Sequence, residues 1–164
     1  MDNDFITGKL KNRFTEDILL IEENGDMLTV VVAGNVIHEV IRFLKENESL
    51  GFTFLTTLCG IHYPDQELQL GVVYHLHRFS GNTRIRIKTF VPLENPVVST
   101  VSDLFSAANW MERETFDFYG IIFEGHPNLK RILNVEYLDY FPLRKEYPLE
   151  DPTREDKDNS FFGR

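Results

Sequence analysis

The sequence predicts an α+β fold, a two-layer sandwich in which helices pack on a mixed β-sheet. Helical and strand periodicities alternate along residues 1–133 in the order α-β-β-α-β-β-β-α. The longest strand pattern is apolar on one face only, so the sheet needs a cover on that side. A chain of 164 residues with 42% apolar residues can bury a core of its own. Residues 134–164 show neither periodicity, and we expect them to form an extended C-terminal arm.

The first elements are a short helix and a β-hairpin. Apolar residues recur at helical spacing over residues 6–14, which predicts an N-terminal helix. Two strand patterns, residues 18–21 and 27–33, flank the pair Asn24-Gly25. This pair suits the positive backbone angles of a tight hairpin turn, so we expect the two strands to be antiparallel.

A second helix and a third strand follow. Asn35 is the expected N-cap of a helix that ends near Asn47 and covers one sheet face with an i, i+3, i+4, i+7 stripe. Residues 52–60 form a β-branched and aromatic run typical of a strand, and residues 61–66 are expected to be a loop. Cys59 lies in this apolar run, which indicates a buried, inert thiol. The apolar stripe consists of Ile37, Val40, Ile41 and Leu44.

Two long strands come next. Residues 67–79 alternate between apolar and polar side chains, and Gly81-Asn82 predicts a two-residue turn to the following strand. That turn would place Leu76 opposite Ile87 and, further along, Val72 opposite Val91. The other face would then carry a basic strip, which could be either a solvated surface or an interface. The basic strip consists of His75, His77, Arg84, Arg86 and Lys88.

The last helix is predicted within residues 99–120 and ends at Gly120. Its end carries the sequence ERETFDFYG. Glu112 and Glu114 are two residues apart and therefore point about 200° away from each other, which argues against an acid/base pair in one cleft. Aromatic side chains also lie off the core-facing stripe, so something else should cover them. The stripe is Leu104, Ala108, Met111, Thr115 and Phe118, and the aromatic residues are Trp110, Phe116 and Tyr119.

Composition excludes several functions. The net charge of -9 argues against a nucleic-acid partner, and no run approaches the ~20 apolar residues of a membrane span. A single cysteine cannot hold an iron-sulfur cluster. Nucleotide-binding and acyl-transfer motifs are missing, and His126 lacks a second metal ligand at local spacing, which favours a structural hydrogen bond. We therefore predict no catalytic, cofactor-binding or metal-binding residue in this chain.

The C-terminal arm is rich in aromatic residues and carries mixed charges. Three prolines interrupt it, and disordered segments are usually poor in aromatic residues. Extended arms bind by placing aromatic and arginine side chains in separate pockets. The arm is therefore predicted to dock on a partner, although a disordered tail remains the alternative.

Two segments resemble a known signature. Residues 112–133, ERETFDFYGIIFEGHPNLKRIL, and the later FPLRKEYPLED are similar to the C subunit of the proton-pumping NADH-quinone oxidoreductase, respiratory complex I, of the bacterial type. The matching positions are Glu112, Arg113, Glu114, Asp117, Phe118, Tyr119, His126, Lys130, Ile132 and Leu133.

The resemblance implies a structural subunit of the peripheral arm with no cofactor of its own. In such complexes electrons pass from NADH through flavin and iron-sulfur clusters of partner subunits to quinone, coupled to proton translocation. It implies contacts with the quinone-site subunit, which is the D subunit of such complexes, and with neighbouring iron-sulfur subunits. It also implies a peripheral location on the cytoplasmic side of the cell inner membrane. The isolated chain would not be catalytic.

From this resemblance we expect the charged residues to form buried or interfacial ion-pair networks, with two basic residues anchoring the arm. One alternative is the equivalent subunit of a membrane-bound hydrogenase or ferredoxin-dependent relative. A remote alternative is a free-standing acid/base enzyme that uses Glu114, Asp117 and His126. The expected network consists of Glu112, Arg113, Glu114, Asp117, His126, Lys130 and Arg131, and the anchors are Arg144 and Lys145.

Overall fold

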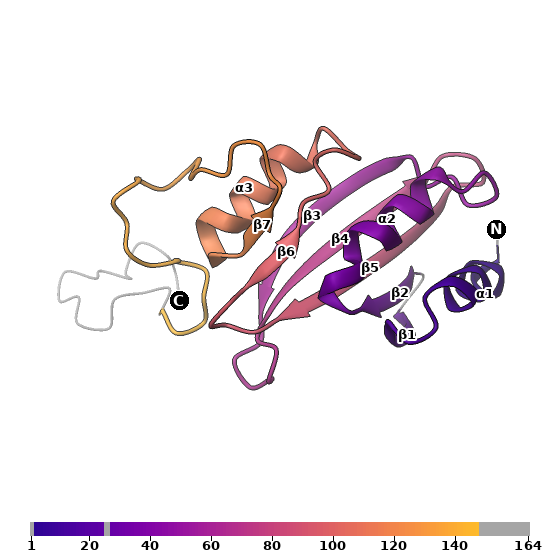
Figure 1. The fold of residues 1–164 in the computed structure, drawn as a ribbon, viewed down its shortest axis with the longest axis horizontal. Helices are drawn as coiled ribbons and strands as arrows, with labels where there is room; N and C mark the ends of the chain where they lie inside the picture. Colours follow the sequence, from indigo (N-terminus) through magenta and orange to yellow (C-terminus); the bar gives the residue numbers. More distant parts are fainter. Residues whose placement is uncertain (1, 25–26, 148–164) are drawn as a thin grey trace, which may run out of the picture.

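A computed structural model of the chain describes residues 2–24 and 27–147 (Figure 1). It contains a five-stranded sheet of order β1-β2-β5-β4-β3 and a separate two-stranded sheet of β6 and β7. The elements are α1 Asn3–Arg13, β1 Ile18–Asn24, β2 Met27–Val32, the 3-10 turn η1 Gly34–Val36, α2 Ile37–Glu46, β3 Phe54–His62, β4 Leu70–Arg78, β5 Thr83–Val91, β6 Val97–Ser99, α3 Ala108–Tyr119 and β7 Ile122–Glu124.

The large sheet is mixed, as the sequence predicts. Strands β2 and β5 are parallel, whereas the pairs β1–β2, β3–β4 and β4–β5 are antiparallel. The hairpin of β1 and β2 is therefore confirmed, but its predicted turn at Asn24-Gly25 extends outside the described residues. The small sheet is a feature that sequence analysis missed, because strands of three residues are too short to show a period.

The core lies between the helices and one face of the sheet. Figure 1 shows α2 lying across β4 and β5, with α1 beside β1 and α3 along β3. The predicted stripe of α2 is completely buried, and so are Ile6 and Leu10 of α1. On β4 the predicted inward face is confirmed at Leu70, Val72 and Leu76, which are fully buried. Burial does not alternate along the whole strand, because Val73 on the opposite face is buried too, and Leu68, predicted to face inward, precedes the strand and is exposed. None of the helices in the described part of the chain is long and apolar enough to cross a membrane.

The predicted register between β4 and β5 is wrong by two residues. Leu76 faces Ile85 rather than Ile87, and Leu70, rather than Val72, faces Val91. The reason is a longer loop, because Arg78 pairs with Thr83 and leaves residues 79–82 between the strands. A shift of two residues keeps every side chain on its predicted face.

Three local predictions are also corrected. Asn35 is not the N-cap of α2, because the 3-10 turn η1 contains it and Val36 takes the cap position. Strand β3 begins at Phe54 because the Phe52 amide donates to the Leu44 carbonyl at the end of α2, and it continues to His62. Cys59 is exposed rather than buried, since it lies on the outer face of β3, which is an edge strand.

Candidate functional site: the charged end of α3

Helix α3 ends where the signature charges are concentrated. Gly120 takes the left-handed conformation after the last helical residue, with φ of 76°, and its amide donates to the Phe116 carbonyl. A Cβ atom at this position would lie 2.5 Å from the Phe141 ring. Glycine is therefore required here both for the backbone angle and for the close approach of the C-terminal segment.

Asp117 is fully buried and holds a turn of the chain that follows. Its Oδ2 atom accepts hydrogen bonds from the backbone amides of Ile132 (3.0 Å), Leu133 (2.8 Å) and Asn134 (2.9 Å). Its Oδ1 atom accepts from the Arg131 guanidinium at 2.9 Å and from the Asn134 side chain at 3.1 Å. Burial by itself raises the pKa of Asp117, but these hydrogen bonds outweigh it and hold the pKa well below its ordinary value.

Arg131 extends this network to the segment beyond it. Its guanidinium donates to the Asp117 carbonyl at 2.9 Å, to the Leu138 carbonyl at 2.8 Å and to the Tyr140 carbonyl at 3.2 Å. The same group lies 5.0 Å from the centre of the Phe141 ring. Within the expected network, Arg131 therefore forms an ion pair with Asp117, and its hydrogen bonds to the two carbonyls fix the path of residues 138–141.

Glu112 is also fully buried, on a different side of α3. Its carboxylate accepts from the Val101 amide at 2.7 Å and from the Thr100 hydroxyl at 2.5 Å. The His126 ring lies farther away, with its Nε2 atom 4.0 Å from Oε2. Burial is the main cause that raises the pKa of Glu112 to about 7, and the two hydrogen bonds reduce the shift only in part.

His126 has the structural role that the sequence predicts. Its Nδ1 atom accepts from the Asn128 amide at 3.0 Å, so Nε2 carries the proton and faces the Asn109 carbonyl at 3.1 Å. Within the described ranges no group of three His, Cys, Asp or Glu side chains could hold a metal ion. The structure also argues against the remote acid/base alternative, which needs three side chains in one pocket. Glu114 lines a surface pocket, whereas the side chains of Asp117 and His126 are buried and do not line it.

Arg113 contacts backbone oxygens rather than a carboxylate. It donates to the carbonyls of Lys130 (3.1 Å) and Arg131 (3.3 Å), and it lies 4.9 Å from the centre of the Trp110 ring. Lys130 takes part in the network through its backbone carbonyl, which accepts from Arg113. Trp110 is 63% exposed, so Arg113 covers one ring face and leaves much of the residue open.

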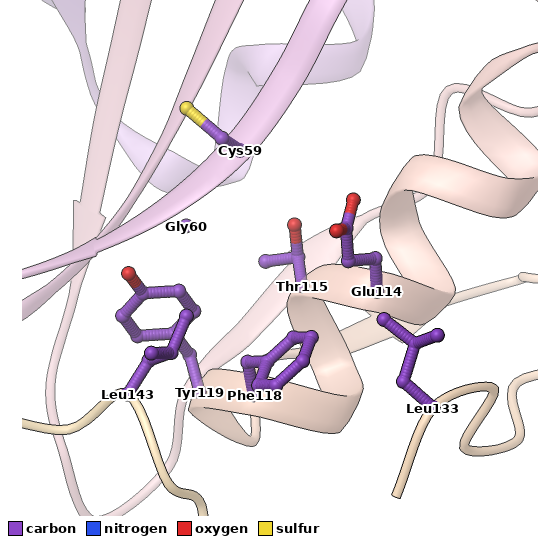
Figure 2. Close-up of a pocket in the computed structure, with 8 residues that line it drawn as sticks. All are labelled: Cys59, Gly60, Glu114, Thr115, Phe118, Tyr119, Leu133 and Leu143. Carbon is purple, nitrogen blue, oxygen red and sulfur yellow. The ribbon is translucent and has the colours of Figure 1, made fainter. Parts of the chain in front are cut away.

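The remaining signature acid, Glu114, is exposed. No hydrogen bond or ion pair joins its carboxylate to another residue in the described part of the chain. It lines a pocket of about 370 Å³ between α3, β3 and the C-terminal segment. Figure 2 shows Leu143 beside Tyr119 at this pocket, with Cys59 and Gly60 on the strand above them.

The first part of the predicted arm, residues 134–147, contacts its own globule. Arg144 donates to the Tyr119 carbonyl at 2.8 Å and lies 4.6 Å from the centre of the Phe141 ring. The Lys145 amide donates to the His62 ring at 2.9 Å, and the Leu143 amide donates to the Phe118 carbonyl at 3.2 Å. Arg144 therefore holds the segment to α3 through its side chain, whereas the contact of Lys145 with β3 is made by its backbone amide and leaves the predicted role of its charge untested. Docking on a partner stays a prediction, and residues 148–164 lie outside the described residues.

The basic strip is present on the outer face of the sheet. Strand pairing places His75 opposite Arg86, and the Arg86 side chain donates to the His75 ring at 2.9 Å. Burial and the nearby charges of Arg86 and Lys88 lower the pKa of His75. Lys88 lies 3.9 Å from Glu22, which offsets one of these charges.

Known proteins confirm the resemblance carried by these residues. A family described as the respiratory-chain NADH dehydrogenase 30 Kd subunit matches residues 30–153. The chain belongs to this family. The C subunit of the NADH-quinone oxidoreductase of Roseiflexus sp. (strain RS-1) is 42% identical over 149 residues, which are 91% of this chain and 86% of that protein.

Two solved structures share the fold. The Nqo5 trypsin-resistant fragment (1-134) is 33% identical, with a TM-score of 0.65 over 76% of this chain and 98% of the fragment. A chain of the membrane-bound sulfane sulfur reductase, an archaeal respiratory membrane complex, has a TM-score of 0.75 over 94% of this chain and 96% of its own length. The latter is 24% identical and shows a common fold only. Family membership makes this chain one subunit of a hetero-oligomeric oxidoreductase complex.

Proposed function

We propose that this chain is a structural subunit of the peripheral arm of an NADH-quinone oxidoreductase, and that it carries no cofactor itself. Its task is to hold neighbouring subunits in place while electrons pass from NADH through their flavin and iron-sulfur clusters to quinone. Its partners are the quinone-site subunit and neighbouring iron-sulfur subunits. The complex lies on the cytoplasmic side of the cell inner membrane, and the isolated chain has no turnover of its own.

The observation that carries this proposal is that both buried signature acids, Glu112 and Asp117, are hydrogen-bonded to other segments of the same chain. The Asp117 carboxylate is occupied by residues 131–134 and the Glu112 carboxylate by residues 100–101. Both are closed to solvent, so neither can reach a substrate. Carboxylates used in this way fix backbone segments, which is a structural rather than a chemical role.

Purification from native membranes tests the proposal. We expect the tagged chain, solubilised in mild detergent, to bring flavin and iron-sulfur subunits with it. Recovery of the chain alone in an active form would contradict the proposal. Recovery of iron-sulfur subunits without an NADH-binding flavoprotein would instead support a related complex, such as a hydrogenase or ferredoxin-dependent enzyme.

The variant Arg113→Ala tests the structural role more directly. It removes the hydrogen bonds to the carbonyls of Lys130 and Arg131, so we expect less assembled complex. Arg42→Ala, which changes an exposed arginine on α2, is the matched control and should assemble normally. Normal assembly of the Arg113 variant with lost electron transfer would point to a chemical role and overturn the proposal.

A further inference from the structure

The pocket beside α3 combines an apolar wall with polar groups that no described residue binds. Phe118, Leu133 and Leu143 contribute carbon surface, and Tyr119 contributes a ring and a hydroxyl group. In the described part of the chain, no hydrogen bond reaches the Tyr119 hydroxyl or the Glu114 carboxylate. Figure 2 shows these side chains arranged around one opening.

This combination fits one kind of side chain best. An apolar occupant would shield the Glu114 carboxylate from water without giving it a partner, which costs free energy. A lysine or arginine would place its carbon stem on the apolar wall and its charge at the carboxylate. Arginine adds a planar group that stacks on an aromatic ring and donates several hydrogen bonds at once, so it uses both Glu114 and Tyr119.

The chain binds its own arginines in the same manner. Arg113 combines the Trp110 ring with two carbonyl oxygens, and Arg131 combines the Phe141 ring with the Asp117 carboxylate. The pocket offers the same pairing of an aromatic ring with an oxygen acceptor. Its rim carries Leu133, a residue that is 66% exposed, as expected for a surface that another protein covers.

We propose that this pocket receives an arginine side chain of a neighbouring subunit and that Glu114 is its counter-ion. The inference rests on the proposed function, since it requires that the chain sits within a complex. It gives Glu114 a role that differs from those of Glu112 and Asp117, which bind residues of their own chain. Glu114 would thus be the signature acid that points outward to a partner.

Charge reversal tests the inference in the assembled complex. We expect partner subunits to dissociate about tenfold faster from the Glu114→Arg variant during a salt wash, and less than that from Glu114→Gln. Glu39→Arg, at an exposed glutamate of α2, is the matched control and should dissociate like the unmodified complex. The thermal midpoint of each isolated full-length chain checks folding, and it should not change for an exposed residue. Unchanged dissociation of Glu114→Arg would overturn the inference.

A photo-crosslinker in place of Leu133 identifies the occupant. We expect it to link to a peptide of another subunit that contains an arginine, and exchange of that arginine for glutamate should restore slow dissociation to Glu114→Arg. Linkage to residues 148–164 of the same chain, or to a peptide without a basic residue, would overturn the inference. If no partner subunit is recovered with the unmodified chain, it is the proposed function that fails.

Discussion

Glu112 and Asp117 lie five positions apart on one helix, and both are fully buried, yet their pKa values shift in opposite directions. The pKa of Glu112 rises to about 7, whereas that of Asp117 falls well below its ordinary value. Burial disfavours the charged form of both groups. Much of the difference comes from the hydrogen bonds that each carboxylate accepts in place of water, and the nearby charge of Asp103 adds to the rise of the Glu112 pKa.

The number and kind of donors decide the outcome. Asp117 accepts five hydrogen bonds, three of them from consecutive backbone amides and one from a guanidinium. Glu112 accepts two, from the Val101 amide and the Thr100 hydroxyl, and the His126 ring is 4.0 Å away. The many donors thus keep Asp117 an anion despite its burial, whereas Glu112, with fewer donors, holds its proton near neutral pH.

We expect the greatest loss of stability at the Asp117 end. In Asp117→Asn the guanidinium of Arg131 stays buried without its counter-ion, so the free energy of unfolding should fall by about 3–5 kcal/mol. Urea unfolding of the isolated full-length chain at neutral pH measures it. Asp139→Asn, an exposed control, should change it by less than about 0.5 kcal/mol. A loss below about 1 kcal/mol for Asp117→Asn would show that the network contributes little.

The pH dependence of the stability that Asp117 contributes follows from the direction of its pKa shift. Because the folded-state pKa of Asp117 is depressed, its contribution to stability is present above the ordinary value of 3.8 and is lost as the pH falls below it. Acid should therefore loosen residues 131–134 first. Hydrogen exchange of the amides of Leu133 and Asn134 at decreasing pH would detect this loss.

The contribution of Glu112 to the free energy of unfolding has the opposite pH dependence, and we expect it to be somewhat smaller than that of Asp117. Its folded-state pKa is raised from 4.5 to about 7, so its contribution is present below pH 4.5 and is lost as the pH rises through 7. The shift corresponds to about 3 kcal/mol. We expect Glu112→Gln to remove this slope, as measured by urea unfolding at several pH values between these limits. Equal slopes in the variant and the unmodified chain would contradict the pKa assignment.

A weaker effect is expected from His126, whose Nε2 atom lies 4.0 Å from the Glu112 carboxylate. In His126→Gln the hydrogen bond to the Asn109 carbonyl is weakened, and we expect a loss of about 1 kcal/mol in the free energy of unfolding. Urea unfolding over the same pH range measures it. The slope due to Glu112 should persist, because burial rather than the imidazole causes it. Loss of that slope in His126→Gln would show that the ring controls the proton on Glu112.

Regular periodicity made the larger elements predictable. The buried stripe of α2, the inward face of β4 and the end of α3 at Gly120 are local patterns that the structure confirms. Strands β6 and β7 were missed because three residues carry no period. The exposed Cys59 was missed because composition does not say which strand lies at a sheet edge.

The candidate site was predictable in its residues but not in its contacts. The signature string alone was sufficient to indicate the family and to place Glu112, Glu114 and Asp117 in an expected ion-pair network. It could not say that two of them are buried against residues 100–101 and 131–134 while the third lines a surface pocket.

Local sequence was enough to define the helix that carries these acids, the glycine that ends it and the family to which the chain belongs. The folded arrangement was needed to tell which acid is charged, which holds a proton and which faces outward. The cause is that the pKa of a buried carboxylate depends on donors brought to it by the folded chain, here from positions 11 to 17 residues away. Such distant contacts leave no periodic signal in the sequence around the acid itself.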